Sequence, residues 1–220
     1  MTGVAVAVSP KKVSTLLVVD RSSERSGAVS RAYRRIPFEL AGDAARRHLR
    51  GPKSVSWRTV DDDEELARLL ARTVAASDDP REIATVGVHG SRAVAAAMIE
   101  DVRRGNGYQC HPSWWSIVDL DGVPSGFVLP VVLTGCDREG LDEGTIYHIG
   151  VVPEQCGRDL GRLLLGRGTD ALLHHGVWQI STDTAVENAP MIRLFEGQGW
   201  TRLPPVEMAG HPLPGLRDIP

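Results

Sequence analysis

The sequence predicts an α/β protein in which one mixed sheet carries helices on both faces. Apolar runs of strand length alternate along the chain with segments whose apolar residues recur at helical spacing. Read in order from residue 53, these segments give β-α-α-β-β-β-α-β-α-β, which predicts a layered sheet-and-helix architecture. A length of 220 residues with 42% hydrophobic content provides for one domain of ordinary size plus an appendage.

The expected strands are rich in β-branched and aliphatic residues and are bounded by turn residues. They cover residues 13–20, 54–60, 114–120, 127–133, 145–152, 177–184 and 200–208. Pro130 interrupts the fourth of these strands. Because proline has no amide hydrogen for a ladder, its presence predicts an edge strand or a bulge at that point.

The expected helices show apolar stripes and terminal signals, and they cover residues 39–51, 61–76, 92–104, 157–174 and 189–199. The first ends at Gly51 with Pro52 just beyond it, and the last begins at Pro190. The acidic run 61–65 complements the positive end of a helix dipole, which we prefer to a cation site as its interpretation.

The first fifty residues are too few for a confident core of their own. We therefore expect residues 1–52 to be an N-terminal extension packed on a main domain of residues 53–220. Within the extension, residues 1–12 predict a loose terminus.

Composition excludes several classes of function. A formal net charge of −3 gives no broad electrostatic reason to bind nucleic acid or an anionic membrane. The three cysteines are widely spaced, which suggests reduced thiols rather than a disulfide framework or a metal knuckle, so we expect no metal. Apolar runs fall short of the ~20 residues that span a bilayer, and the order of charge at the N-terminus does not fit a secretory signal. These features predict a soluble, cytoplasmic protein.

The stretch GVVPEQCGRDLGRLLL, residues 150–165, reads as a strand end, a glycine-bearing turn and a helix start. Glycine permits close approach to the backbone, and the first amides of a helix have no partners within it. Such amides form an anion site suited to phosphate. A plain tight connection between strand and helix is the other reading of the turn.

Three phosphate or nucleophile motifs do not fit this turn. A P-loop ends in Gly-Lys-Ser/Thr, whereas Gly161 is followed by Arg162 and Leu163. A dinucleotide fingerprint needs Gly-x-Gly-x-x-Gly, and Asp159 interrupts that spacing. A nucleophile elbow needs a serine, which the turn lacks.

The turn resembles the acetyl-CoA-binding motif of the GNAT acyltransferase superfamily. That motif has Val-x-Pro closing a strand, then Arg/Gln-x-x-Gly-x-Gly/Ala opening a long helix. About forty residues downstream, ENAPMIRLFEGQGW resembles the second signature, Asn-x-x-Ala-x-x-Leu-Tyr-x-x-x-Gly-Phe, with Asn188, Leu194, Gly199 and Trp200 in register. The resemblance covers about residues 53 to 208.

The resemblance implies a GNAT-like fold, a mostly antiparallel sheet with one splayed pair of strands, and acetyl-CoA or another acyl-CoA as cosubstrate. The pantetheine arm would pair with the strand backbone at Ile149, Val151 and Val152. The pyrophosphate would meet the turn and the helix start, formed by Cys156, Gly157, Arg158, Asp159, Leu160, Gly161 and Arg162. Gly150 suits a local bulge and a close ligand approach. Asn188 would contact the cofactor, or is simply an N-cap.

Three residues depart from the family pattern. Cys156 replaces Arg or Gln, and we expect a spectator thiol there because no neighbouring base is evident. Asp159 replaces a glycine; it tolerates unusual backbone angles, but its charge would repel a pyrophosphate unless Arg158, Arg162 or solvent screens it. Phe195 replaces a tyrosine that in many members protonates the departing thiolate, a role that phenylalanine cannot fill.

Proton transfer is expected on the strand 145–152. Family members often use a residue that matches Thr145 or Tyr147, so Tyr147 is the first candidate, as an acid or as a link in a water chain. His148 is the better base at neutral pH. Because side chains alternate along a strand, however, His148 is expected on the face opposite to Tyr147 unless a bulge shifts the alternation. A backbone amide near Ile149 to Val151 would stabilise the oxyanion.

The acceptor is an amine of a small molecule or of a protein, and the sequence does not identify it. Glu143 could contact a cationic substrate, while of the adjacent Trp114 and Trp115 one is expected in the core and the other beside the acceptor. The preferred function is N-acyl transfer by direct attack. A weakly active CoA-binding sensor or scaffold, and an anion-binding protein without CoA, are the alternatives. A monomer or a homodimer fits equally.

Overall fold

The computed structural model describes residues 32–42, 51–105 and 107–208, which belong to one compact unit. The loose terminus expected at 1–12, the strand expected at 13–20 and most of the helix expected at 39–51 lie outside the described residues.

Five α-helices lie within the described ranges: α1 (Asp63–Ala75), α2 (Pro80–His89), α3 (Ser91–Arg104), α4 (Leu160–His175) and α5 (Ala189–Gly197). All but α2 confirm helices expected from the sequence. Asp62 begins α1 by accepting a hydrogen bond from the amide of Glu64, as an N-cap residue does. None of the helices in these ranges combines the length and the apolar character needed to cross a membrane.

The sequence analysis missed α2. Its start carries recognisable signals, because Asp79 caps the amide of Arg81 and Pro80 occupies the first turn. The helix has only ten residues and none of them is fully buried, although Val86 packs on the cluster under α1 and α3. So short a segment offers few repeats of the apolar pattern from which a helix is predicted.

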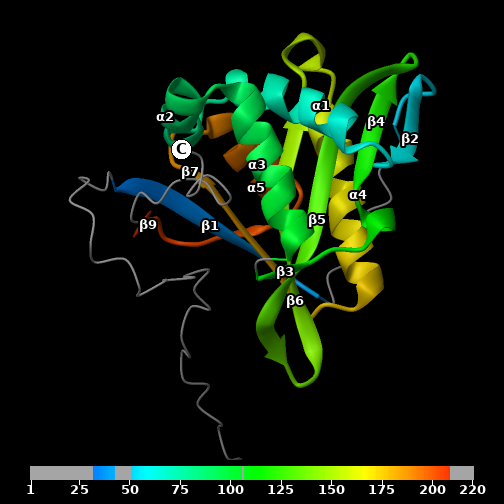
Figure 1. Cartoon of the computed structure of the whole chain (residues 1–220). Coiled ribbons are helices and arrows are strands. Elements are labelled where there is room, and N and C mark those ends of the chain that lie inside the picture. The colour runs from blue at the N-terminus through cyan, green and yellow to red at the C-terminus, as the bar shows by residue number, and fades with distance from the viewer. Residues whose placement is uncertain (1–31, 43–50, 106, 209–220) are drawn as a thin grey trace, which may run out of the picture. The chain divides into compact units, whose positions relative to one another are not determined.

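In the part of the chain that the structure describes, nine strands form one sheet: β1 (Tyr33–Ala41), β2 (Val55–Thr59), β3 (Tyr108–Gln109), β4 (Ser116–Leu120), β5 (Val123–Arg138), β6 (Leu141–Val151), β7 (Gln179–Ala185), β8 (Thr201–Arg202) and β9 (Val206–Met208). The spatial order is β2-β4-β5-β6-β7-β1-β8, with β3 paired to β5 and β9 paired to β1 (Figure 1). The pair β6–β7 is parallel and the other pairs are antiparallel. The predicted mixed, mostly antiparallel sheet is confirmed.

Strand β1 is the main difference from the expected elements. It comes from the region that the sequence analysis treats as an extension, and it runs between β7 and β8 inside the sheet. The helix expected over residues 39–51 is wrong at its start, because residues 39–41 end β1. Alternation explains the strand, because Ile36 and Phe38 are buried on one face. Pro37 lies between them and Arg35 and Glu39 flank them, which disguises the pattern.

The parallel strands β6 and β7 separate halfway along their length. Their register joins Glu143 through Thr145 with Gln179 through Ser181. Farther on, β6 pairs with β5 and β7 pairs with β1, and no further β6–β7 ladder pair occurs among the described residues. This divergence confirms the splayed pair of strands implied by the resemblance.

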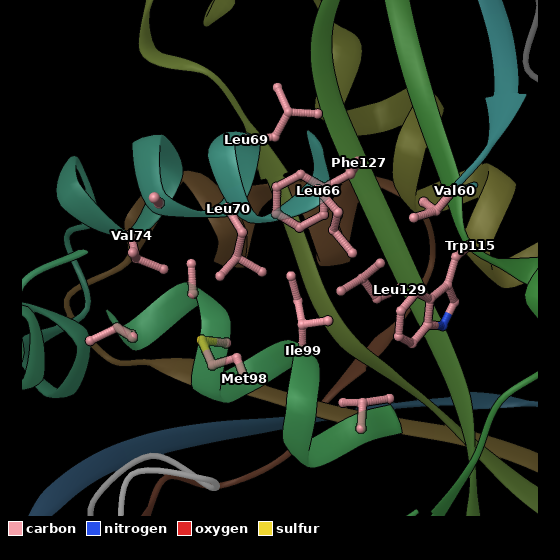
Figure 2. Close-up of a cluster of buried hydrophobic side chains, with 14 of the residues drawn as sticks. Val60, Leu66, Leu69, Leu70, Val74, Met98, Ile99, Trp115, Phe127 and Leu129 are labelled. Carbon is pink, nitrogen blue, oxygen red and sulfur yellow. The ribbon is translucent and has the colours of Figure 1, made fainter. Parts of the chain in front are cut away.

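Helices cover both faces of the sheet and create two hydrophobic clusters. On one face α1 and α3 pack on β5, and Figure 2 shows Leu66, Leu70, Ile99 and Phe127 meeting there. On the opposite face, α4 and α5 bury a second cluster that includes Phe38 and Leu164. Because each face of β6 has its own cover, the backbone edge of β6 beside the divergence is the part of the strand left to meet a ligand.

Candidate functional site

A bulge in β6 sets the direction of two candidate proton-handling residues. Leu129 of β5 pairs with His148 and Pro130 pairs with Ile146, so Tyr147 is an extra residue in β6. Tyr147 packs on the cluster under α1 and α3, and the His148 ring stacks on Phe127 of that same cluster, 5.7 Å between centroids. The bulge therefore brings both side chains to one face.

The pairing of β5 with β6 bears on what the sequence predicts at Pro130 and at Gly150. The bulge predicted from Pro130 is confirmed, while β5 lies in the interior of the sheet and is not an edge strand. The bulge does not lie at Gly150, which has a packing role. A Cβ at Gly150 would come 2.8 Å from Cγ2 of Thr73, so the glycine allows α1 to approach β6.

The backbone of β6 presents hydrogen-bonding groups toward the divergence. The amide of Val152 donates to the carbonyl of Ser125 on β5, at 2.9 Å. Since backbone groups alternate in direction along an antiparallel strand, those of Val151 and Ile149 point away from β5. They face the side from which β7 has separated, as pairing with an extended ligand requires.

The turn from β6 to α4 presents a row of backbone donors. A short 3-10 helix, Pro153–Gln155, is followed by Gly157 and Asp159, whose φ angles are +78° and +62°. The first amide of α4 to find a carbonyl is that of Leu163, which donates to Asp159 at 3.4 Å. In the described part of the chain, the amides of residues 160–162 have no acceptor. Together with the helix dipole they form an anion site.

The structure refines which residues of the turn can donate. Cys156 was expected to begin the row of amides, but its N–H donates to the Pro153 carbonyl at 3.2 Å. The Cys156 thiol is exposed and lies near the carbonyl oxygens of Val151 and Val152. Within the described residues, the amides without an acceptor thus begin after Cys156, at Gly157.

The three charged residues that follow Gly157, namely Arg158, Asp159 and Arg162, differ in their surroundings. Arg162 donates through its guanidinium to the Asp159 carboxylate at 2.6 Å, so the negative charge beside the free amides has a partner within the chain. Arg158 is exposed. Asp159 adopts the left-handed conformation that asparagine and aspartate tolerate better than most residues.

Asn188 occupies the N-cap of α5, where its side-chain oxygen accepts from the amide of Met191 at 3.1 Å. Helix α5 is tied to the start of α4 because Gln198 donates to the carbonyl of Arg162 at 2.9 Å. The capping role of Asn188 is thus present, and its amide nitrogen stays available for a ligand.

Tyr147 is held by α3. Its hydroxyl donates to the Met98 carbonyl at 3.3 Å and lies 3.4 Å from the Asp101 carboxylate. Its ring also meets Tyr108 edge to face, 5.2 Å between centroids. Burial, and then the charge of Asp101, raise the pKa of Tyr147 above its ordinary value. The phenol is therefore neutral at physiological pH.

His148 faces the start of α2. Its Nδ1 lies 3.8 Å from Oε1 of Glu82, and each side chain is 14% exposed. Nearby, Arg35 of β1 links the carboxylates of Asp79 and Asp183, which ties α2 to the diverging strand β7. The sequence analysis missed these charged residues because α2 and β1 were not recognised.

The expected substrate residues lie apart from this region or within the core. Trp115 is 1% exposed, and Arg103 covers its ring at 4.3 Å. Trp114 packs on His175, which ends α4, a helix of 16 residues and so about 24 Å long. Trp114 therefore lies at the end of α4 opposite to the turn.

Glu143, the candidate contact for a cationic substrate, is buried. Its side chain accepts a hydrogen bond from the hydroxyl of Ser181, and only 3% of the residue is exposed. Burial raises the pKa of Glu143, and the nearby Glu39 raises it further. Phe195, at the position of the family tyrosine, packs on Phe38 and Trp200. Among the described residues, no group of three or more His, Cys, Asp and Glu side chains is arranged to hold a metal ion.

Comparisons with known proteins agree with this geometry. A family model described as the acetyltransferase (GNAT) family matches residues 45–200. The ribosomal protein bS18-alanine N-acetyltransferase of Salmonella typhimurium is 32% identical over 100 residues, which cover 42% of this chain and 68% of that protein.

Solved structures share the fold at low identity. A tandem GNAT protein from the clavulanic acid biosynthesis pathway has a TM-score of 0.56 at 19% identity, covering 83% of this chain and 55% of that chain. The NatC complex bound to Gag peptide and CoA contains a chain with a TM-score of 0.50 at 18% identity, covering 69% of this chain and 87% of its own length. Several similar structures are longer, and this chain spans 50% to 63% of their length. The match over residues 45–200, with the splayed strands and the turn described above, shows that this chain belongs to the GNAT acetyltransferase family.

Proposed function

We propose that this protein transfers an acetyl group, or another acyl group, from acyl-CoA to a primary amine. The observation that carries the proposal is the row of free amides at residues 160–162 beside the diverging edge of β6. A CoA pyrophosphate needs several donors in one place, and a helix start supplies them without a charged side chain. Family membership supports the same cosubstrate.

The residues of this chain fit such a cosubstrate. The N–H and C=O groups of Ile149 and Val151 would pair with the amides of the pantetheine arm, as an added strand does. The turn residues 157–162 would hold the pyrophosphate. At Gly161 an added Cβ would meet only Leu194, at 3.5 Å, so the glycine leaves its outer side open to a ligand. Asn188 would contribute its side-chain amide from the start of α5.

The chemistry needs a neutral amine and a stabilised oxyanion. His148 would accept a proton from the ammonium form of the acceptor, after which the amine nitrogen attacks the thioester carbonyl carbon. The carbon–nitrogen bond forms and the carbon–sulfur bond breaks. The attacking nitrogen loses its second proton to solvent as the intermediate collapses, and the thiolate takes up a proton from the imidazolium or from solvent. A backbone amide of Ile149 or Val151 would donate to the carbonyl oxygen as its charge grows.

Tyr147 is the second candidate for moving a proton. It is neutral and carries a hydroxyl proton, which fits an acid for the thiolate. Its hydrogen bond to α3 would have to break first, so the contacts favour His148. In this proposal Tyr147 chiefly fixes the bulge that directs His148.

The acceptor class rests on the relatives. The curated relative acts on an alanine of a ribosomal protein, and a similar solved chain was captured with a peptide. These names favour a protein or peptide amine over a small molecule. We further propose a cytoplasmic location, supported by the free thiols of Cys110, Cys136 and Cys156.

A CoA-binding sensor without turnover is the second candidate, and Phe195 favours it because a buried phenylalanine cannot protonate a thiolate. Thiol release from acetyl-CoA, measured over a panel of alanyl peptides, lysyl peptides and small amines, separates the two. Amine-dependent release that falls at least tenfold in His148→Gln, with a smaller loss in Tyr147→Phe, supports the transferase. A rise in melting temperature with CoA but no release over the panel would support the sensor. No rise at millimolar CoA would contradict both.

A further inference from the structure

Glu82 is a carboxylate turned inward at the start of a helix. Acidic residues in a first helical turn are normally solvated, as Asp63 and Glu64 of α1 are, with side chains 50% and 81% exposed. Glu82 occupies the matching turn of α2 but is only 14% exposed. Burying a carboxylate is costly unless a partner compensates it. The partner that Glu82 faces is Nδ1 of His148.

The neighbouring carboxylates are engaged elsewhere, and the guanidinium of Arg81, the preceding residue on α2, interacts favourably with the charge of Glu82. Asp79 caps the amide of Arg81 and contacts Arg35, and Asp183 also contacts Arg35. On α3, Asp101 meets the hydroxyl of Tyr147. Glu82 is therefore the carboxylate that this region directs at His148.

The nitrogen of His148 that faces Glu82 is Nδ1, at 3.8 Å, an ion-pair contact rather than a hydrogen bond. Because a carboxylate attracts a proton and cannot donate one, this placement favours the tautomer with the proton on Nδ1 and the lone pair on Nε2. Stacking on Phe127, with 14° between the ring planes, limits rotation of the imidazole. The bulge at Tyr147 fixes the side of the sheet on which the ring lies.

We propose that Glu82 is a positioning residue for the transfer reaction. It holds His148 in the tautomer whose Nε2 accepts the proton of the acceptor amine, and its charge stabilises the imidazolium that results. The proton then leaves to the thiolate or to solvent, which restores the starting tautomer. This inference rests on the proposed function, because it assigns Glu82 a role in the same reaction.

The role predicts a specific kinetic pattern. Glu82→Gln should lower kcat about tenfold or more, since a correctly placed general base contributes roughly a hundredfold or more. The KM for acetyl-CoA should stay within about twofold, because Glu82 would not touch the cosubstrate. Glu82→Asp, which keeps the charge on a shorter side chain, should recover part of the lost kcat.

A double-mutant cycle with His148 tests the inference. In the His148→Gln background, adding Glu82→Gln should cause no further loss of kcat, because the residue through which Glu82 acts is already gone. Losses that multiply, or a kcat of Glu82→Gln within twofold of the wild type, would overturn the proposal. Glu100→Gln on α3 is the matched control, since Glu100 is 57% exposed and pairs with Arg104.

The melting temperature of the variants and the thiol release of the wild type distinguish failure of this inference from failure of the proposed function. The melting temperature of each variant reports whether α2 still folds, and a Glu82→Gln variant that loses kcat while keeping its melting temperature supports positioning. Amine-dependent release by the wild type with no effect of Glu82→Gln contradicts this inference alone. A wild type that releases no thiol with any amine contradicts the proposed function and this inference with it.

Discussion

The guanidinium of Arg162 lies 2.6 Å from the carboxylate of Asp159, three residues earlier at the start of α4. The sequence places the negative charge of Asp159 beside amides suited to bind an anion, where it would repel the ligand. The ion pair with Arg162 partly neutralises that charge. The same aspartate holds the left-handed turn with a φ of +62°. Asp159 therefore supports the backbone of the turn while its charge is partly neutralised within the chain.

Asp159→Asn should tighten the binding of CoA, roughly three- to tenfold at low salt. Asparagine keeps the left-handed conformation, removes the repulsive charge and releases Arg162 to meet the phosphates. Calorimetric titration with CoA at two salt concentrations measures the change. Asp121→Asn is a matched control, because Asp121 also has a positive φ, +52°, but lies in the turn between β4 and β5. Weaker binding in Asp159→Asn would mean that the carboxylate has a direct role in holding the ligand.

Gly161→Ala should weaken the binding of CoA about tenfold or more, equal to ~1.4 kcal/mol. The new methyl would touch Leu194 at an ordinary 3.5 Å, so the fold should tolerate it. On the ligand side it would crowd the pyrophosphate. Gly87→Ala in α2 adds the same methyl where no atom lies within 4 Å, and it should leave binding unchanged. Equal affinities for wild type and Gly161→Ala would indicate that CoA does not approach this turn.

Local signals made the turn and its helix predictable. Gly157 and the leucines of α4 combine a turn residue with a clear helical stripe, and the Val-x-Pro before them marks the strand end. The bulge at Tyr147 was not predictable in the same way. It depends on the pairing of β6 with β5 across the Leu129/Pro130 shift, which is a long-range property. The sequence therefore identified His148 but could not determine its face.

Strand β1 and helix α2 were not predicted from the sequence, for related reasons. The stretch YRRIPFELA buries Ile36 and Phe38, and its remaining residues are partly or fully exposed. Helix α2 buries no residue at all. An element that is stabilised mainly by contacts with distant parts of the chain shows only a weak pattern in its own sequence. The contacts of Arg35 with Asp79 and Asp183 join β1 to α2 and β7 across long distances in sequence, so they cannot be predicted from either segment alone.

Phe38→Ala should destabilise the protein by about 3–5 kcal/mol, since it empties a fully buried site that also packs on Phe195. Urea unfolding measures the loss. Arg34→Ala on the same strand is exposed and should change stability by less than about 0.5 kcal/mol. A small effect of Phe38→Ala would show that β1 contributes little to the unit, in conflict with its position between β7 and β8.

Glu143 predicts a pH dependence of stability. Burial raises the pKa of Glu143 above its ordinary value of 4.5, so its contribution to stability is full below that value. The contribution is lost as pH rises through the raised pKa, because the folded protein must then hold a buried charge. Glu143→Gln should therefore gain stability relative to the wild type between pH 5 and pH 8. Urea unfolding at both pH values tests this, and a difference that stays constant would argue against the buried carboxyl as its source.

The most direct test of the central claim is amide NMR of the labelled protein with and without CoA. We expect CoA to shift and protect the amides of Leu160, Gly161 and Arg162 together with those of Ile149 and Val151. The amide of Cys156, already bonded to Pro153, should change less. If CoA binds, as a raised melting temperature would report, but leaves the amides of residues 160–162 exchanging as before, then the start of α4 does not hold the pyrophosphate and the account is contradicted.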